Sequence, residues 1–366
     1  MKTKKVIISG GGTGGHVFPA IAIANALKKE HNDLDILFVG AEGKIEMEKV
    51  PAAGYPIKAL PIRGLERKLT LKNISVLFKL IKSLFLSRKI INRFKPDIVV
   101  GVGGFASAPV GWVAGKKGIP VLLQEQNSYA GVTNKLLAKY AKKICVAYDN
   151  MEPYFPKEKI IKTGNPVRQS LFENQPDKTE AFKYFGLKPD IKTILVLGGS
   201  GGARSINEGV IAGLENIKKS EIQILWQTGK FYYQKSNDAL KKSGANNCKV
   251  YDFISRMDYA YAVADLVISR AGAATISELC LLKKASILVP SPNVAEDHQT
   301  KNAMALVEKD AAVLVKDLET KEKMINTALD LINNQEKIQQ LSTNAAKLGI
   351  KNADKMIAKE IIKIIN

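Results

Sequence analysis

Four glycine-rich turns follow apolar runs in this sequence, and they are the features whose residue types point most directly to chemistry. They occupy residues 10–15, 101–104, 198–202 and 270–275. Glycine adopts backbone conformations that other residues avoid, and it lets a phosphate group approach the main chain closely. A helix that starts after such a turn offers unpaired N–H groups and the positive end of its dipole. The turns therefore predict backbone sites for an anionic ligand such as a diphosphate. They do not match the dinucleotide-binding pattern well, and no P-loop motif is present.

Two side chains near the turns could accept a proton. His16 directly follows the first turn, at the expected start of a helix. A neutral imidazole there can act as a general base or bind a ligand. Glu125, at the end of an expected strand, is the alternative base, although it could equally be a structural carboxylate that nearby N–H groups satisfy. Since no Asp-x-Asp motif follows a strand, the sequence does not require a bound metal, and it indicates no cofactor.

Short apolar runs alternate with helical patterns along the chain, which predicts an α/β protein. Most of these runs are continuously apolar, as expected for parallel strands covered on both faces. The pattern restarts after residue 165, so we expect two tandem Rossmann-type domains. The tail is helical in composition, and its last stretch, 353–365, could cap the second domain or cross back to the first. The expected strands are residues 5–8, 35–39, 57–60, 98–101, 121–124 and 143–147 in the first half, and 193–197, 223–227, 249–251, 266–269, 285–289 and 312–315 in the second.

The composition fits a globular protein that binds something anionic. The 366 residues are 46% hydrophobic, and 55 Lys and Arg against 35 Asp and Glu give a formal net charge of +20. Such an excess favours nucleic acid, a phosphorylated substrate or an anionic membrane surface as partner. Cys145, Cys248 and Cys280 are far apart, so we expect buried thiols and neither disulfides nor a zinc site. The apolar run near the N-terminus is too short for a signal peptide, and no stretch is long enough to span a membrane.

Residues 63–95 combine basic and apolar side chains at helical spacing. This pattern is typical of a helix that lies on an anionic membrane, but a Rossmann helix also needs an apolar stripe to pack on its sheet. Both interpretations stay open at this point. The residues expected to contact lipid are Leu77, Phe78, Ile81, Phe85, Lys79, Lys82 and, nearby, Trp112.

The glycine turns belong to a set of motifs that resembles the MurG family, the bacterial peptidoglycan N-acetylglucosaminyltransferases. The resemblance spans nearly the whole chain. Its motifs occur in this order: GGGTGGH at 10–16, GVGGFASAP at 101–109, EQN at 125–127, TGNPVR at 163–168, GGSGGA at 198–203 and SRAGAATISE at 269–278. The sequence departs from the family pattern at Gln124, where a histidine is frequent, and at His298, which replaces the first residue of a Gln-Gln pair.

The resemblance implies a GT-B fold, with two Rossmann-like domains facing across a cleft and a C-terminal helix returning to the first domain. It implies residues 1–166, with the helix at about 348–366, as the acceptor and membrane domain, and residues 167–347 as the UDP-sugar domain. It also implies an inverting transfer of N-acetylglucosamine from UDP-N-acetylglucosamine to the C4 hydroxyl of the muramoyl sugar of lipid I, the undecaprenyl-diphosphate-linked muramoyl-pentapeptide. The product, lipid II, serves cell wall biogenesis, and with it cell shape and cell division, at the cytoplasmic face of the inner membrane.

The resemblance also assigns a set of residues to binding of the donor. Within that set the backbone of Ile254 would face the uracil, Glu278 would bind the ribose, and Ser200 would meet the diphosphate. The rival interpretations are another GT-B enzyme, such as a diacylglycerol glycosyltransferase or a UDP-N-acetylglucosamine 2-epimerase, and a nucleic-acid-binding protein, although no nucleic-acid-binding motif is present. The complete donor set is Thr13, Gly14, Gly15, Asn127, Arg168, Ser200, Ile254, Ala273, Ala274, Thr275, Ile276, Ser277, Glu278 and Gln299.

Overall fold

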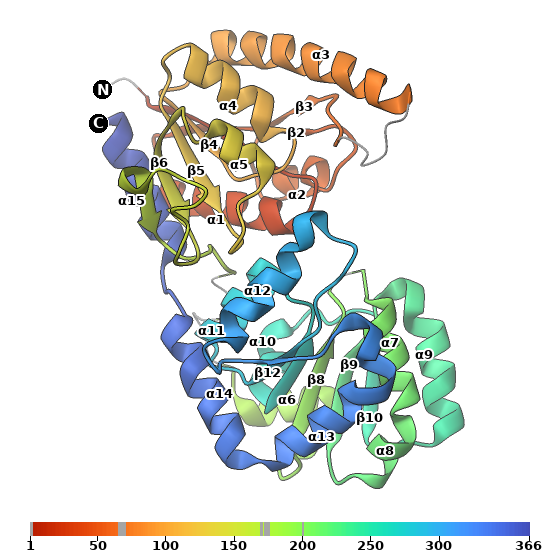
Figure 1. Ribbon diagram of the computed structural model, residues 1–366. Helices are drawn as coiled ribbons and strands as arrows, with labels where there is room; N and C mark the ends of the chain where they lie inside the picture. Colours follow the sequence, from red (N-terminus) through yellow and green to blue (C-terminus); the bar gives the residue numbers. More distant parts are fainter. Residues whose placement is uncertain (1–2, 65–70, 169–170, 172–175, 200) are drawn as a thin grey trace. The chain divides into compact units, whose positions relative to one another are not determined.

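The computed structural model describes residues 3–64, 71–168, 171, 176–199 and 201–366 (Figure 1). Its contacts divide the chain into two compact units. The first unit contains Met1–Val167 together with Ile350–Asn366, and the second contains Arg168–Gly349. The last segment of the chain therefore leaves the second unit and completes the first. None of the helices in the described ranges is long and apolar enough to cross a membrane.

The first unit is built on a seven-stranded parallel sheet with the order β3-β2-β1-β4-β5-β6-β7. Its helices are α1 (Gly14–Glu30), α2 (Glu46–Ala52), α3 (Leu71–Phe94), α4 (Ser107–Lys116), α5 (Val132–Leu137) and α15 (Ala353–Ile365). Its strands are β1 (Lys5–Ser9), β2 (Asp35–Ala41), β3 (Ile57–Leu60), β4 (Ile98–Gly101), β5 (Val121–Glu125), β6 (Ala141–Val146) and β7 (Ile160–Lys162).

Alternate residues of these strands are buried on opposite faces of the sheet. Ile7 and Val99 lie in a core with side chains of α3, α4 and α5. Val6 and Ile98 lie in a second core with side chains of α1 and α15. Helix α15 packs beside α1, which confirms the return of the C-terminal helix to the first unit. Both faces of the strands are covered, as their continuous apolar runs require.

The second unit repeats this construction with a six-stranded parallel sheet in the order β10-β9-β8-β11-β12-β13. Its strands are β8 (Thr193–Leu197), β9 (Gln223–Gln227), β10 (Cys248–Tyr251), β11 (Leu266–Ser269), β12 (Ser286–Leu288) and β13 (Val313–Leu314). Its helices are α6 (Lys178–Phe185), α7 (Arg204–Ala212), α8 (Leu214–Lys219), α9 (Lys230–Ser243), α10 (Met257–Val263), α11 (Ala273–Leu281), α12 (His298–Val307), α13 (Ile325–Asn333) and α14 (Gln335–Leu348).

The two units share a detail at the start of the first strand of each sheet. Asp97 accepts a hydrogen bond of 2.7 Å from the Lys5 N–H, and Asp265 accepts one of 2.8 Å from the Thr193 N–H. Each aspartate directly precedes the strand that pairs with that first strand, β4 or β11. The shared strand order and this shared contact support two copies of one architecture.

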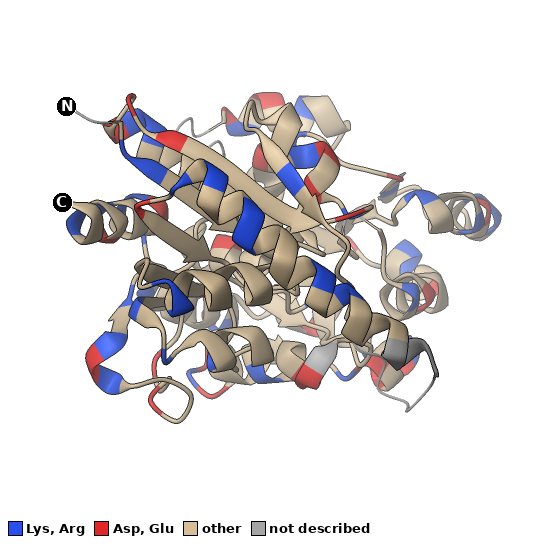
Figure 2. Cartoon of the chain, turned by 90° about the horizontal axis from the view of Figure 1, so that it is seen from above, with Lys and Arg blue, Asp and Glu red and all other residues tan. Residues whose placement is uncertain are grey.

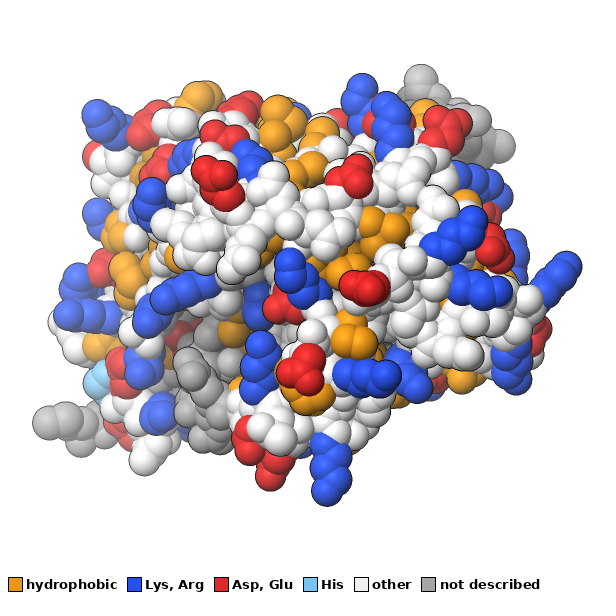
Figure 3. All heavy atoms as spheres, turned by 90° about the horizontal axis from the view of Figure 1, so that it is seen from below, with side chains coloured by type: hydrophobic (Ala, Val, Ile, Leu, Met, Phe, Trp, Pro, Cys, Tyr) orange, Lys and Arg blue, Asp and Glu red, His pale blue; other side chains and the backbone are white. Residues whose placement is uncertain are grey.

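Most expected elements are confirmed, with small differences at their ends. Strand β7 was not expected, because it is only three residues long; it lies at the edge of the sheet. The three cysteines are buried and free, as expected. Burial raises the pKa of each thiol to about 12. On the face seen in Figure 3, Lys and Arg side chains are interspersed with Asp and Glu side chains.

Candidate active site

The first glycine turn leads into an uncapped helix N-terminus. Helix α1 begins at Gly14 with Thr13 as its N-cap residue, but the Thr13 side chain does not cap the helix N–H groups. Its Oγ1 lies instead 3.2 Å from Nδ1 of His16. The first N–H groups of an α-helix have no partner within the helix. The turn therefore presents backbone donors beside a half-buried imidazole.

The second glycine turn interlocks with the first. A Cβ atom at Gly103 would lie 2.7 Å from Cδ2 and 2.8 Å from Nε2 of His16, and one at Gly104 would lie 2.3 Å from the carbonyl oxygen of Gly11. Both glycines have positive φ, 90° and 81°. A side chain at either position would force the two turns apart. The turns after β1 and β4 thus act as one surface that fixes the imidazole.

Glu125 is buried, and its carboxylate is saturated with donors. Oε1 accepts from N and Nδ2 of Asn127 at 3.1 and 3.2 Å, and Oε2 accepts from Gly131 N and Asn134 Nδ2 at 3.0 and 2.9 Å. Desolvation raises the pKa of this carboxyl, and the four hydrogen bonds oppose that rise. Because each oxygen already accepts two hydrogen bonds, the carboxylate is poorly placed to take a proton from a substrate. This geometry favours the structural interpretation of Glu125.

In the second unit, Glu278 lies at the centre of a buried polar contact. Its Oε1 accepts from Nε and Nη2 of Arg168, both at 3.2 Å, and its Oε2 accepts from the Tyr261 hydroxyl at 3.1 Å. Only 7% of the Glu278 side chain is exposed, against 50% of the Arg168 side chain. The pKa of Glu278 is raised, because desolvation raises it by more than Arg168 and Tyr261 lower it. No sequence pattern indicated Tyr261 as a partner of this carboxylate.

The other predicted donor residues of this unit lie at strand ends and helix starts. Helix α11 begins at Ala273 after the N-cap residue Gly272, with no side-chain cap, so the backbone of residues 273–275 is again uncapped. The Ile254 N–H donates to Oε1 of Gln227 at 2.8 Å. Oε1 of Gln299 accepts from the Ser291 N–H at 2.8 Å. Ser200 lies outside the described residues.

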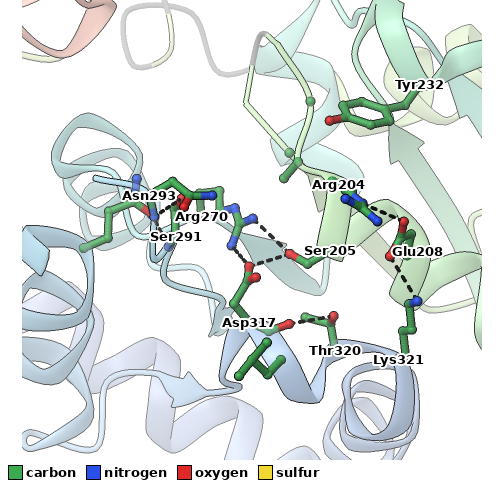
Figure 4. Close-up of a pocket in the computed structure, with 15 residues that line it drawn as sticks. Arg204, Ser205, Glu208, Tyr232, Arg270, Ser291, Asn293, Asp317, Thr320 and Lys321 are labelled. Carbon is green, nitrogen blue, oxygen red and sulfur yellow. Dashed lines mark hydrogen bonds and ion pairs between the residues drawn. The ribbon is translucent and has the colours of Figure 1, made fainter. Parts of the chain in front are cut away.

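A pocket of about 660 Å³ opens beside these elements, between the turn after β8 and the segments that follow β12 and β13 (Figure 4). Arg270 connects the segments that line the pocket. Its guanidinium donates to the Ser205 hydroxyl at 2.9 Å, to Asp317 and to the backbone carbonyls of residues 289 and 290. Glu208 binds Arg204 at 2.9 Å and Lys321 at 3.1 Å. Within the described parts of the chain, no group of three or more His, Cys, Asp or Glu side chains is placed to hold a metal ion.

Comparisons with known proteins agree on the family. The model of the glycosyltransferase family 28 N-terminal domain matches residues 6–146, and that of the family 28 C-terminal domain matches residues 193–361. A protein of Phocaeicola vulgatus is 59% identical over 361 residues, 98% of this chain and 96% of its own length. It is named UDP-N-acetylglucosamine--N-acetylmuramyl-(pentapeptide) pyrophosphoryl-undecaprenol N-acetylglucosamine transferase. The crystal structure of Acinetobacter baumannii MurG has a TM-score of 0.80 and 30% identity, covering 98% of this chain and 99% of the other. The chain belongs to the MurG family.

Membership of the MurG family confirms the GT-B class expected from the sequence. The same architecture is found in UDP-GlcNAc 2-epimerase from Neisseria meningitidis, which was solved with UDP-GlcNAc bound. Its TM-score is 0.69 at 16% identity, and the match covers 98% of this chain and 100% of the other. Identity this low shows the fold alone.

The predicted lipid-facing residues of this MurG-family chain lie on the outer side of α3 and on α4. Their exposed fractions are 57% for Leu77, 69% for Phe78, 44% for Ile81, 71% for Phe85 and 42% for Trp112. The opposite side of α3 is buried through Ser83, Ser87 and Ile91, with Leu84 packed against the core. Figure 2 shows Lys and Arg along the same helix. Of the two predicted lysines, Lys79 is partly exposed and Lys82 is exposed. The apolar positions 77, 78, 81 and 85 therefore face away from the sheet.

Proposed function

We propose that this chain transfers N-acetylglucosamine from UDP-N-acetylglucosamine to the C4 hydroxyl of the lipid-linked muramoyl-pentapeptide and so makes lipid II. The observation that carries this proposal is the 59% identity, over nearly all of both chains, with a transferase named for that donor and that acceptor. The first glycine turn with His16, and Glu278 with Arg168 in the second unit, supply groups that such a reaction needs.

The donor binds to the second unit in this proposal. Because the Ile254 N–H already donates to Gln227, the Ile254 carbonyl is the group left to accept from N3–H of the uracil. Glu278 accepts from the ribose hydroxyls, while Arg168 offsets its negative charge. The N–H groups at the start of α11 meet the diphosphate, where the helix dipole favours negative charge. The pocket beside Gln299 has room for the sugar.

His16 is the general base of the proposed step. Its Nδ1 lies 3.2 Å from the Thr13 hydroxyl. We assign removal of the proton of the acceptor hydroxyl to the other ring nitrogen, Nε2. The acceptor oxygen then attacks the anomeric carbon from the face opposite UDP. The new C–O bond forms as the bond to the diphosphate breaks, and UDP departs with the electron pair. The configuration changes from α to β. Glu125 holds the 127–134 segment in place through its four hydrogen bonds.

The first unit holds the acceptor at the membrane. The outer side of α3 places apolar rings beside basic side chains, the combination that binds an anionic interface. Peripheral binding of this kind brings a prenyl-linked acceptor to the enzyme at the cytoplasmic face of the inner membrane, and it places the chain in cell wall biogenesis.

The proposal is tested by incubating the enzyme with radiolabelled UDP-N-acetylglucosamine and one acceptor at a time. We expect label in the lipid fraction with a lipid I analogue, and none with diacylglycerol. Label transfer to diacylglycerol alone, or conversion of the free donor to its 2-epimer, would replace the proposal with one of the rival GT-B activities.

A further inference from the structure

Glu46 is a buried acidic residue whose place in the fold the sequence did not suggest. It is the first residue of α2, and only 1% of it is exposed. Within the described residues its hydrogen-bond partners are two backbone N–H groups. Oε2 accepts from Gly12 at 2.8 Å, and Oε1 accepts from Ala41 at 2.9 Å. The carboxylate thus joins the first glycine turn to the end of β2.

Two glycines make room for this carboxylate. A Cβ atom at Gly11 would lie 2.1 Å from Glu46 Oε1, and one at Gly40 would lie 2.5 Å from Glu46 Cγ. Burying an acidic group is costly unless hydrogen bonds compensate the lost hydration. A chain that needed only stability could fill this place with an apolar side chain. A buried carboxylate enclosed by two glycines indicates that its two acceptor atoms have a specific task.

The contacts continue from Glu46 to the imidazole. Gly12, which donates to Glu46, is followed by Thr13, and Thr13 contacts both the backbone and Nδ1 of His16. The carbonyl of Gly11 packs against Gly104, whose neighbour Gly103 lies under the imidazole ring. A movement of residues 11–12 would therefore shift the ring relative to both turns.

We propose that Glu46 is a positioning residue for the transfer reaction, acting through the first glycine turn on His16. This inference rests on the proposed function, in which His16 takes the acceptor proton. Both oxygens of Glu46 are required because each faces an N–H donor. A glutamine has one acceptor oxygen, and its amide N–H₂ would face the second donor. An aspartate keeps the charge but is one methylene too short to reach both.

The test compares Glu46→Gln and Glu46→Asp with Glu48→Gln. Glu48 lies on the same helix with 75% of its side chain exposed, so it controls for the loss of a charge. Turnover is measured with UDP-N-acetylglucosamine and a lipid I analogue, UDP affinity by calorimetry, and folding by thermal melting. We expect kcat to fall at least about ten-fold in both Glu46 variants. We expect UDP affinity to change less than about two-fold, because the donor site is assigned to the other unit, and Glu48→Gln to match the wild type.

A double-mutant cycle separates positioning from general damage. If Glu46 acts through His16, then Glu46→Gln lowers kcat by less than about three-fold in a His16→Ala background. Full additivity of the two losses would overturn the inference, and so would wild-type turnover in Glu46→Gln. A Glu46 variant unfolded at the assay temperature would also overturn it, since the carboxylate would then serve stability. Absence of transfer by the wild type is a different result and would instead refute the proposed function.

Discussion

Charge reversal on α3 gives a quantitative test of membrane binding. Lys82 is exposed and Lys79 is partly exposed, and each directly follows an exposed apolar residue of α3, Ile81 or Phe78. Each basic side chain near an anionic membrane surface contributes about 1 kcal/mol. Replacing both lysines by glutamate removes two attractions and adds two repulsions of similar size. The expected loss is ~2–4 kcal/mol, or about 30-fold to 1000-fold in vesicle affinity.

The apolar side chains make a separate contribution with a different salt dependence. Phe78 and Phe85 are 69% and 71% exposed, and full burial of a phenylalanine side chain is worth roughly 1.5–3 kcal/mol. Replacing both by serine therefore removes about 2–4 kcal/mol if both rings enter the interface. This loss should persist at high salt. The effect of the lysine variant should shrink there, because added salt screens exposed charges within a Debye length.

The assay is cosedimentation with vesicles of phosphatidylglycerol and phosphatidylcholine at low and high salt. A control with Lys241→Glu and Lys242→Glu alters two exposed lysines of α9 in the second unit, and it should bind as the wild type does. Unchanged binding by both α3 variants, or an equal loss in the control, would refute the assignment of α3 to the membrane.

Three further predictions concern the two candidate sites. His16→Ala should lower kcat by about 10²–10⁴-fold. Glu125→Gln should mainly lower the melting temperature, because the glutamine amide N–H₂ would face N–H donors that now bind a carboxylate oxygen. A large loss of turnover in Glu125→Gln and a loss of melting temperature alone in His16→Ala would exchange the two roles. Arg168→Met should weaken UDP binding measured by calorimetry and destabilise the protein by about 1–2 kcal/mol, less than for a fully buried pair because Arg168 is half exposed; unchanged UDP affinity would contradict the ribose site. Burial raises the folded pKa of Glu278, so the folded protein binds that proton more tightly than the unfolded chain. Relative to Glu278→Gln, the wild type should therefore lose free energy of unfolding as the pH rises through the pKa of Glu278 in the folded protein. Denaturant titrations at several pH values measure this loss. Parallel pH profiles of the two proteins would contradict the prediction.

The sheets could be predicted from the sequence because their strands are continuously apolar. Strands β1 and β8 each run into a glycine turn and a helix, so the repeat of the architecture was also visible. The edge strand β7 was not predicted because it has only three residues, too few to show a strand pattern. Contacts between distant segments, such as that of α15 with α1, depend on packing that no local pattern encodes.

The side chains that support the site were harder to predict than the site itself. Glu46 stands close to Glu42 and Glu48 in a segment that looks like a solvated helix end, and the glycines at 11 and 40 were the only trace of its burial. Tyr261 gave no signal, because a tyrosine inside an apolar helix resembles any core residue. The orientation of α3 was ambiguous because both of its sides carry apolar residues. The structure decides it, because Ser83 and Ser87 are buried and α3 packs beside α4.

The central claim, transfer of N-acetylglucosamine to one hydroxyl of a lipid-linked muramoyl sugar, is tested most directly by the linkage in the product. The enzyme is incubated with UDP-N-acetylglucosamine and a lipid I analogue, and the purified product is analysed by mass spectrometry and NMR. The account predicts one added N-acetylhexosamine in β linkage at C4 of the muramoyl residue. An α linkage, attachment at another position or an unmodified acceptor would contradict it.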